Sequence, residues 1–222
     1  MGNIDSDGFE VLEDFISSDE VAGLIGAIQS HQLGAARSGV RNAEKKFAAI
    51  NDLVTSSELR GRASEYLSGK PNLVRVILFD KTPENNWLVT WHQDKTIALS
   101  GKADIEGWGP WSVKDGTHHV QPPLDVLNNM VTFRIHLDKT TRDNGCLRVI
   151  KGSHKLGILS AAEIGKHVAS YKPVECEVMA GSAFVMRPHL LHASSKALQP
   201  SNRRIIHVEY SVYELPAGLE WS

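Results

Sequence analysis

The sequence predicts a mainly β fold with flanking α-helices. Two helix-capping signals, each followed by apolar residues at helical spacing, lie in the first 70 residues. Seven short β-prone runs, broken by turn residues, follow Pro71. Runs of this kind favour a sandwich or barrel over βαβ units. At 222 residues the chain fits a single domain, in which residues 1–70 form a mostly helical support for a β-rich core at residues 71–222.

The predicted helices begin at two capping signals. Ser17 to Glu20 resembles a capping box, and apolar residues then recur at helical spacing from Val21 to Ile28. A second signal at Thr55 to Glu58 precedes an apolar face that runs from Leu59 to Leu67, with Gly69 as the expected terminator. Between these helices, residues 38–47 are polar and predict a loop or a short helix.

The predicted strands occupy residues 73–79, 87–93, 131–137, 147–150, 174–178, 182–186 and 205–213. Residues 101–123 show no clear periodicity, and long connections of this kind in compact domains are often active-site lids. Two tryptophans in so short a segment need an apolar surface to cover, so we expect substrate contact there. The candidate substrate-binding residues are Trp111, as the leading one, and Lys114, His118 and Gln121.

The most informative motif is His92-Gln-Asp94. In an extended strand, residues two apart project to the same face, about 6 to 7 Å apart. With His192 as a third ligand, two imidazoles and one carboxylate leave the other metal positions free, which is the ligand set of non-haem Fe(II) oxygenases. The sequence therefore predicts an open iron site at His92, Asp94 and His192. His189 is the alternative third ligand, but alternation places it on the opposite face.

The segment after residue 181 offers a third ligand and guanidinium groups together. An oxygenase that uses 2-oxoglutarate needs a fixed cation for the distal carboxylate, and the forked guanidinium of arginine suits that task better than a lysine amine. The sequence is thus consistent with 2-oxoglutarate as a cosubstrate of the iron site.

Four motifs carry a resemblance to a known family: residues 8–16, Trp91 to Asp94, Asn144 to His154, and His192 to Ser194 with Arg203. They span nearly the whole chain, which resembles the phytanoyl-CoA dioxygenase family of Fe(II)- and 2-oxoglutarate-dependent oxygenases. The resemblance implies a double-stranded β-helix, a distorted jelly roll of cupin-like form. It also implies a cytoplasmic enzyme that uses Fe(II), 2-oxoglutarate and O2 to hydroxylate an aliphatic C–H bond, with release of succinate and CO2.

The resemblance also assigns roles to single residues. His92, Asp94 and His192 would bind iron, Arg203 would pair with the 2-oxoglutarate carboxylate, and Ser194 would hydrogen-bond it. The family's related halogenases carry a small residue at the carboxylate position, so the presence of Asp94 favours hydroxylation.

Three further basic residues precede or follow the motif. Arg75 and Arg134 each lie inside an apolar run, where burial requires an anionic partner, and the cosubstrate is one available anion. We therefore include both as tentative cofactor-binding residues. For Lys81 the pattern favours a solvated position.

The substrate stays open. A small metabolite is the leading expectation, and a fatty acyl-CoA thioester is the alternative. A cupin-like metal dioxygenase without 2-oxoglutarate could carry the same three ligands but would not need Arg203, and a non-enzymatic scaffold would tolerate the loss of His92. Two motif details differ from the common family pattern: Lys151 stands where proline is more usual, and the insert at residues 101–123 is rich in Trp, His and Pro.

Composition excludes several other classes of protein. A net charge of −2 without a block of like charges gives no support for nucleic acid as a partner. No stretch approaches the roughly 20 apolar residues of a membrane span, and the first residues lack the features of a signal peptide. Two cysteines without CxxC spacing favour reduced, structural thiols. We therefore expect a cytoplasmic enzyme with a small-molecule substrate, of unknown oligomeric state.

Overall fold

The structure, a computed structural model, describes residues 2–30, 39–82, 86–198 and 202–222. The helices in these ranges are α1 (Ile4–Asp7), α2 (Ser18–Gln29), α3 (Ala43–Lys46), α4 (Ala48–Thr55), α5 (Ser57–Leu67), α6 (Leu124–Asn128), α7 (Ala161–Ser170) and the short 3-10 helix η1 (Ser153–Leu156). The strands are β1 (Gly2–Asn3), β2 (Phe9–Leu12), β3 (Val40–Arg41), β4 (Asn72–Lys81), β5 (Val89–His92), β6 (Ile97–Leu99), β7 (Trp111–Lys114), β8 (Thr117–Val120), β9 (Met130–His136), β10 (Leu147–Val149), β11 (Val174–Cys176), β12 (Ala183–Met186), β13 (His192–Ser194) and β14 (Arg203–Ser211).

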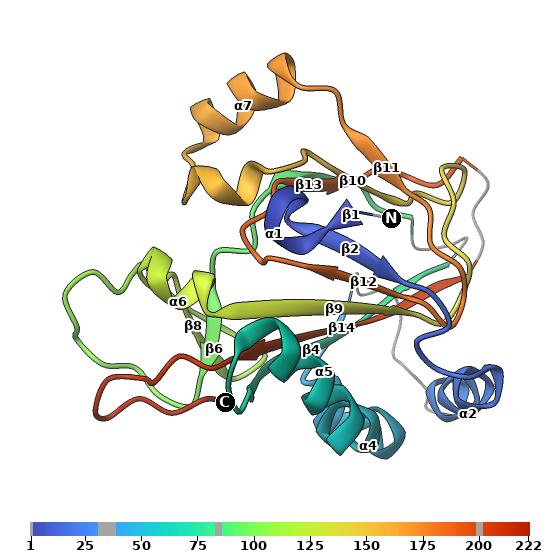
Figure 1. Ribbon diagram of the computed structural model, residues 1–222. Coiled ribbons are helices and arrows are strands. Elements are labelled where there is room, and N and C mark those ends of the chain that lie inside the picture. The colour runs from blue at the N-terminus through green and yellow to red at the C-terminus, as the bar shows by residue number, and fades with distance from the viewer. Residues whose placement is uncertain (1, 31–38, 83–85, 199–201) are drawn as a thin grey trace.

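Two antiparallel sheets form the body of the molecule (Figure 1). The larger has the order β1-β2-β12-β9-β14-β4-β3, and the smaller has the order β11-β10-β13-β5. One cavity is lined by residues of both sheets, so the two sheets face each other across it. The predicted mainly β fold with flanking helices, a double-stranded β-helix, is confirmed.

The two faces of the large sheet differ in chemistry because side chains alternate along each strand. On the outer face, Val76, Phe133 and Val208 join the largest hydrophobic core together with residues of the N-terminal helices. Helices α4 and α5 lie along this face (Figure 1), and α5 presents Leu59 and Ala63 to it. The inner face lines the cavity with polar side chains of β4, β9 and β14.

Both predicted helices form, with small shifts at their ends. Ser17 and Glu20 make the expected capping box at the start of α2. The second helix is capped one residue later than predicted, because the Ser56 hydroxyl accepts the Leu59 amide, while Thr55 closes the additional helix α4. It ends at Ser68, in the left-handed conformation, rather than at Gly69. Within residues 38–47, Ser38 lies outside the described residues, and the rest contains β3 and the short α3.

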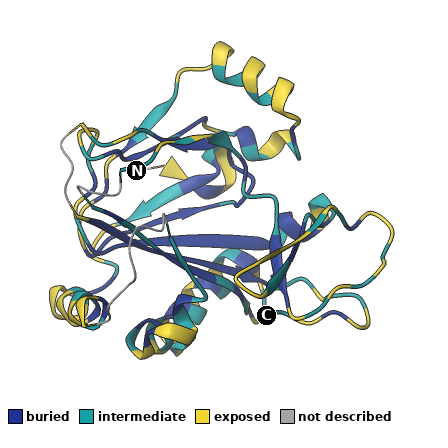
Figure 2. Ribbon diagram, turned by 180° about the vertical axis from the view of Figure 1, so that it is seen from behind, coloured by how far each residue is buried: buried dark blue, intermediate teal, exposed yellow. Residues whose placement is uncertain are grey.

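All seven predicted strands are present, but the N-terminal segment contributes more than helices. Strand β2 pairs with β12 inside the large sheet, and β3 pairs with the opposite edge strand β4. The central strands β9, β12 and β14 are buried, whereas much of α7 is exposed (Figure 2).

The segment at residues 101–123 has more structure than its sequence indicates. Strands β7 and β8 form a hairpin that adds to β6, giving a third sheet of order β6-β8-β7. Trp108 and Trp111 belong to a hydrophobic cluster with Ile97, Leu99 and Val120. The expectation of an unstructured connection is therefore wrong, because this segment forms the β7–β8 hairpin. The apolar surface that the tryptophans cover is this hydrophobic cluster.

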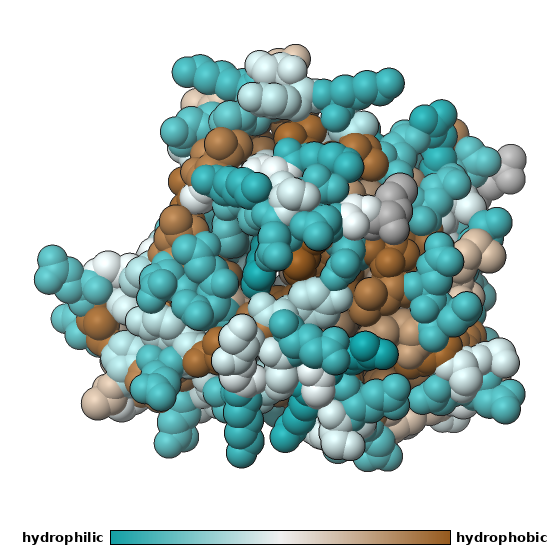
Figure 3. Space-filling view, viewed as in Figure 1, coloured by the Kyte–Doolittle hydropathy of each residue, from teal (hydrophilic) through white to brown (hydrophobic). Residues whose placement is uncertain are grey.

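Hydrophilic side chains dominate the face of the molecule seen in Figure 3, in keeping with the 24 basic and 26 acidic residues of the chain. In the described ranges, none of the helices combines the length and the apolar character needed to cross a membrane.

Candidate active site

Two chain segments, residues 89–94 and residues 188–194, bring His92, Asp94 and His192 together. Strands β5 and β13 pair antiparallel with His192 directly opposite His92, and a register shift follows between His192 and Ser194. The strand ends at His92, so Asp94 lies just beyond it rather than on it, as the alternation argument had assumed. The Asp94 amide donates to the Pro188 carbonyl at 2.9 Å, and this bond holds the carboxylate beside the imidazoles.

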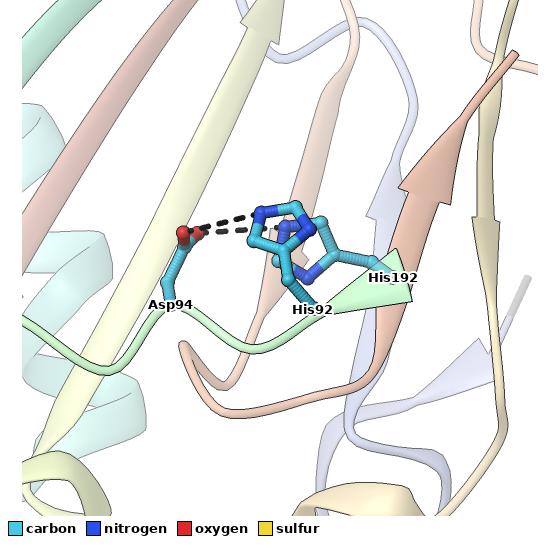
Figure 4. A group of neighbouring side chains, drawn as sticks. All are labelled: His92, Asp94 and His192. Atoms are coloured by element: carbon cyan, nitrogen blue, oxygen red, sulfur yellow. Dashed lines mark ion pairs between the residues drawn. The ribbon is translucent and has the colours of Figure 1, made fainter. Parts of the chain in front are cut away.

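The side chains point toward one another (Figure 4). The Nε2 atom of His92 lies 3.6 Å from one Asp94 oxygen, and Nε2 of His192 lies 3.6 Å from the other. The two imidazole rings have centroids 4.2 Å apart. The three candidate ligand atoms all lie within 4.8 Å of one another, close enough to hold a single metal ion.

Backbone hydrogen bonds fix both imidazoles in the same tautomer. Nδ1 of His92 bonds to the carbonyl of Thr90 at 2.8 Å, and Nδ1 of His192 bonds to the carbonyl of Leu190 at 2.8 Å. A carbonyl can only accept, so each Nδ1 carries the proton and each Nε2 presents a lone pair toward Asp94. Sequence reasoning expected such partners for metal-binding imidazoles but could not name them.

The charges of the three groups suit a cation. Burial lowers the pKa of His192 to about 3, with the neighbouring His92 adding to the effect, so His192 is neutral. For Asp94 burial acts to raise the pKa, but His192 and His92 outweigh it and hold the pKa well below its usual value. For His92 burial opposes the charged form, yet the nearby Asp94 carboxylate raises its pKa. The donor set is therefore one carboxylate and two imidazoles whose Nε2 atoms face it, which fits a divalent ion such as Fe(II).

A cavity of about 240 Å³ opens beside these residues. The small sheet contributes Val89, Leu147 and Ser194, in addition to the two histidines. From the large sheet, register places the lining residues in rows across β4, β14 and β9. In one row the lining residue Arg75 pairs with Glu209, which is not itself in the lining, and in the next row His207 pairs with Ile77 and with Arg134, all three of which line the cavity.

Arg203 and Ser194 lie together at the inner end of the cavity. Both are buried, and Arg203 Nη1 donates to the Gly145 carbonyl and, at 3.4 Å, to the Ser194 hydroxyl. The Arg203 Nε atom is buried and has no hydrogen-bond partner among the residues that the structure describes. Burial, with Arg134 nearby, lowers the pKa of Arg203 to about 10, so the side chain stays charged at neutral pH. These groups fit the carboxylate of a cosubstrate, since the Arg203 guanidinium has an N–H donor available to bind an anion.

Lys81 lies behind the same hydroxyl, and the expectation that it is solvated is wrong. It is 1% exposed, and its Nζ donates to Ser194 Oγ at 3.2 Å and to the Ser195 carbonyl at 2.9 Å. Strand β4 continues to Lys81, which pairs with Arg203 across the sheet, and this pairing draws the amine inside. Burial, with the charges of Arg203 and Arg134, lowers its pKa to about 7.

Arg75 and Arg134 are buried, and protein groups partner both. Arg75 lies 2.5 Å from the Glu209 carboxylate. Arg134 Nη1 donates to His207 Nδ1 at 3.1 Å, which leaves His207 Nε2 to donate to Glu209 at 3.0 Å. Both arginines line the cavity, so they stay candidates for contact with a bound anion. A second group that could hold a metal ion consists of Asp94, His207 and Glu209, but His207 and Glu209 already hydrogen-bond to each other in this network.

The four candidate substrate residues differ in whether they line the cavity. Lys114 lines the cavity, whereas Trp111, His118 and Gln121 are absent from its lining. In the β7–β8 hairpin, Lys114 pairs with Thr117 on one face, while Trp111 and His118 occupy the other face over the hydrophobic cluster. The sequence showed no clear periodicity in this segment, so neither the hairpin nor the face that meets the cavity could be read from it.

Two other residues lie near the candidate metal ligands or were alternatives to them. Gln93, which sequence reasoning did not single out, is buried between them, and its amide spans the carbonyls of Gly157 and His189 and the amide of Leu159. The alternative ligand His189 lines a different pocket, with His154, and takes no part in the metal cluster.

Comparisons with known proteins agree with this geometry. A family model described as phytanoyl-CoA dioxygenase (PhyH) matches residues 4–205. A curated relative, phytanoyl-CoA dioxygenase 1 of Oryza sativa subsp. japonica, is 33% identical over 96 residues, which span 39% of this chain and 33% of that protein. The chain thus matches about a third of that relative's length.

Solved structures show the same fold at low identity. AviO1 from Streptomyces viridochromogenes Tue57 has a TM-score of 0.71 at 24% identity, with 96% of this chain and 93% of that chain covered. EctD from S. alaskensis, with 2-oxoglutarate and 5-hydroxyectoine, has a TM-score of 0.72 at 20% identity, covering 94% and 73%. HygX from Streptomyces hygroscopicus, with nickel and 2-oxoglutarate bound, has a TM-score of 0.67 at 15% identity, covering 94% and 83%.

Proposed function

The chain belongs to the phytanoyl-CoA dioxygenase family, and from that premise we propose that it is an Fe(II)- and 2-oxoglutarate-dependent dioxygenase. It hydroxylates an aliphatic C–H bond of a small metabolite, with O2 as oxidant and with release of succinate and CO2. The observation that carries this proposal is the convergence of His92, Asp94 and His192 within 4.8 Å, beside a cavity with Arg203 at its inner end.

The metal ligands of this enzyme are His92, Asp94 and His192. Their Nε2 atoms and carboxylate face one point, and the backbone bonds at both Nδ1 atoms hold the rings in the required tautomer. Bound iron supplies the activation of O2 and the oxidation of the C–H bond. The chain's contribution is to keep three of the metal's positions filled by protein, so that the others stay available for cosubstrate and O2.

The cosubstrate's distal carboxylate is held by Arg203 and Ser194. The buried, unpartnered Nε of Arg203 offers a donor that no described protein group uses. The Ser194 hydroxyl now donates to the Gly145 carbonyl at 2.8 Å and lies within reach of the same site. Support also comes from EctD and HygX, which share the fold and were solved with 2-oxoglutarate bound.

Apolar side chains exclude water from the space between the metal ligands and Arg203. Phe79, Trp87 and Leu147 line the cavity, and Phe79 also packs on the Arg134 guanidinium at 5.4 Å. A dry lining strengthens the electrostatic contacts made inside it.

We extend the proposal to organisation and location. Residues 1–222 form one catalytic domain, with residues 1–70 supporting the β core and residues 101–123 covering it. Both cysteines are free and buried, with burial raising the pKa of Cys146 to about 11 and of Cys176 to about 12, which suits structural thiols in the cytoplasm. The substrate is a small molecule.

The test is succinate release from 2-oxoglutarate by the full chain with Fe(II) and ascorbate, with iron content measured in parallel. His92→Ala is expected to lose both bound iron and turnover, while His167→Ala, a histidine on α7 outside the cavity, keeps both. Arg203→Ala is expected to keep iron and lose 2-oxoglutarate turnover. Turnover unchanged in Arg203→Ala, or iron content unchanged in His92→Ala, overturns the proposal. Oxygen consumption that needs iron but not 2-oxoglutarate would instead indicate a cupin-like dioxygenase.

A further inference from the structure

Two basic side chains at the solvent side of the cavity have no task in the chemistry proposed above. Arg41, at the end of β3, and Lys114, at the end of β7, both line the cavity. Arg41 is half-buried and Lys114 is exposed, so they stand at the rim, while Arg203 lies at the buried end.

A hydrogen bond between their neighbours holds the two cations at one place. Asn42 follows Arg41, and its side-chain amide donates to the Thr117 hydroxyl at 3.2 Å, across 75 residues of sequence. Thr117 is the register partner of Lys114 in the hairpin. On the other side, Arg41 pairs with Ile77 of the large sheet. The rim is therefore built from two sheets that this contact ties together.

The rim carries positive charge that is not paired directly with any carboxylate among the described residues. Neither Arg41 nor Lys114 makes a side-chain hydrogen bond or ion pair with another residue in the described ranges. Partial burial lowers the pKa of Lys114, and the charges of Arg75 and Arg41 lower it further. Close by, burial and the charges of Arg75 and Lys114 lower the pKa of the buried His119 to about 4, so His119 is neutral and adds no charge to the rim.

A count of charges separates the rim from the inner cavity. Among the described residues, the lining holds one carboxylate, Asp94, and five arginine or lysine side chains, which are Arg41, Arg75, Lys114, Arg134 and Arg203. Arg75 is paired with Glu209 behind the wall. Iron with Asp94 and the two carboxylates of 2-oxoglutarate sums to one negative charge, which Arg203 or Arg134 offsets. After this count the other of these two inner arginines and both rim cations, Arg41 and Lys114, remain without a negative charge to offset them.

We propose that the substrate carries an anionic group, a carboxylate or a phosphate, which Arg41 and Lys114 bind at the rim of the cavity. The inference rests on the proposed function, because it takes the inner cavity to be filled by cosubstrate. Ile77, the register partner of Arg41, also lines the cavity, so the carbon skeleton of the substrate passes an apolar side chain next to the rim. The anchor at the rim fixes which carbon reaches the metal.

The test measures anion binding rather than turnover. Inorganic phosphate, and separately acetate, is titrated by calorimetry into the full chain loaded with Ni(II) and 2-oxoglutarate, so that the inner end is occupied. Nickel is the metal found with 2-oxoglutarate in HygX. We expect saturable binding of at least one anion, weakened about tenfold or more in the double variant Arg41→Gln, Lys114→Gln. A stronger response to phosphate indicates a phosphate ester, and a stronger response to acetate indicates a carboxylic acid.

The matched control removes the same net charge elsewhere. Lys102→Gln with Lys166→Gln alters two exposed lysines outside the cavity and is expected to bind the anion like the wild type. Absence of binding by both anions, or equal weakening in this control, overturns the inference. So does binding that survives in the rim variant and disappears in Arg203→Gln. Failure of the proposed function would appear separately, as a chain that does not take up 2-oxoglutarate in the loading step.

Discussion

Replacement of Lys81 by methionine tests the electrostatics of the inner cavity. The Lys81 amine is almost fully buried and forms no ion pair with a carboxylate in the ranges that the structure describes. Its surroundings lower its pKa from the usual 10.5 to about 7. Methionine keeps much of the side-chain volume and removes the charge.

The effect on stability depends on pH with a definite sign. The folded pKa lies below the unfolded one, so between pH 7 and 10.5 the unfolded chain binds more protons at this position than the folded chain does. The penalty for burying Lys81 is therefore complete below pH 7 and disappears as the pH rises toward 10.5. Between about pH 6.5 and about pH 9.5, the wild type should gain about 3 kcal/mol relative to Lys81→Met.

Urea denaturation of the metal-free wild type and variant at both pH values measures this difference. The variant also loses the bonds from Lys81 to Ser194 and Ser195, but that loss does not depend on pH, so the change in the difference isolates the charge. Free energies of unfolding that run parallel in the two proteins across this pH range would refute the reasoning.

Three further predictions concern single residues near the site. Arg203→Lys keeps a charge but loses the fork and should weaken 2-oxoglutarate binding by about tenfold or more in calorimetry at unchanged iron content, whereas equal affinity would contradict the assigned contact. Gly145→Ala should lower the free energy of unfolding by about 1 to 3 kcal/mol, because φ is +81° and the new Cβ would lie 2.5 Å from the Ser195 carbonyl oxygen. The exposed Gly61→Ala in α5, with nothing within 4 Å, should instead raise it by about 0.5 to 1 kcal/mol, and the same sign in both variants would contradict this prediction. Gln93→Ala should lower the free energy of unfolding by about 2 kcal/mol in urea denaturation, since buried backbone groups lose their hydrogen-bond partner. It should also weaken iron binding in a metal titration. An unchanged iron affinity would show that Gln93 does not position the ligands.

The sequence predicted those features of the fold and of the site that depend on short-range patterns of residues. Alternation and turn residues located the strands, and the types and spacing of His92 and Asp94 indicated a metal pair. The remote His192 was found because imidazole and guanidinium groups stand close together there, and the structure places it opposite His92.

Features that depend on pairing between distant segments were beyond the sequence. The burial of Lys81 follows from its place opposite Arg203 in the sheet, and no local pattern shows that. The side of the hairpin that Trp111 occupies depends on the cluster formed with Ile97 and Val120. The role of Gln93 depends on backbone groups more than 60 residues away, so only the folded chain shows it.

The bonds from His92 and His192 to carbonyls two residues earlier in the same segment have a consequence for how this enzyme can change. Because the acceptors are main-chain atoms, mutation of neighbouring side chains cannot delete them. Side chains of the cavity wall can thus be substituted to accommodate new compounds while the strand backbone keeps the orientation of both rings.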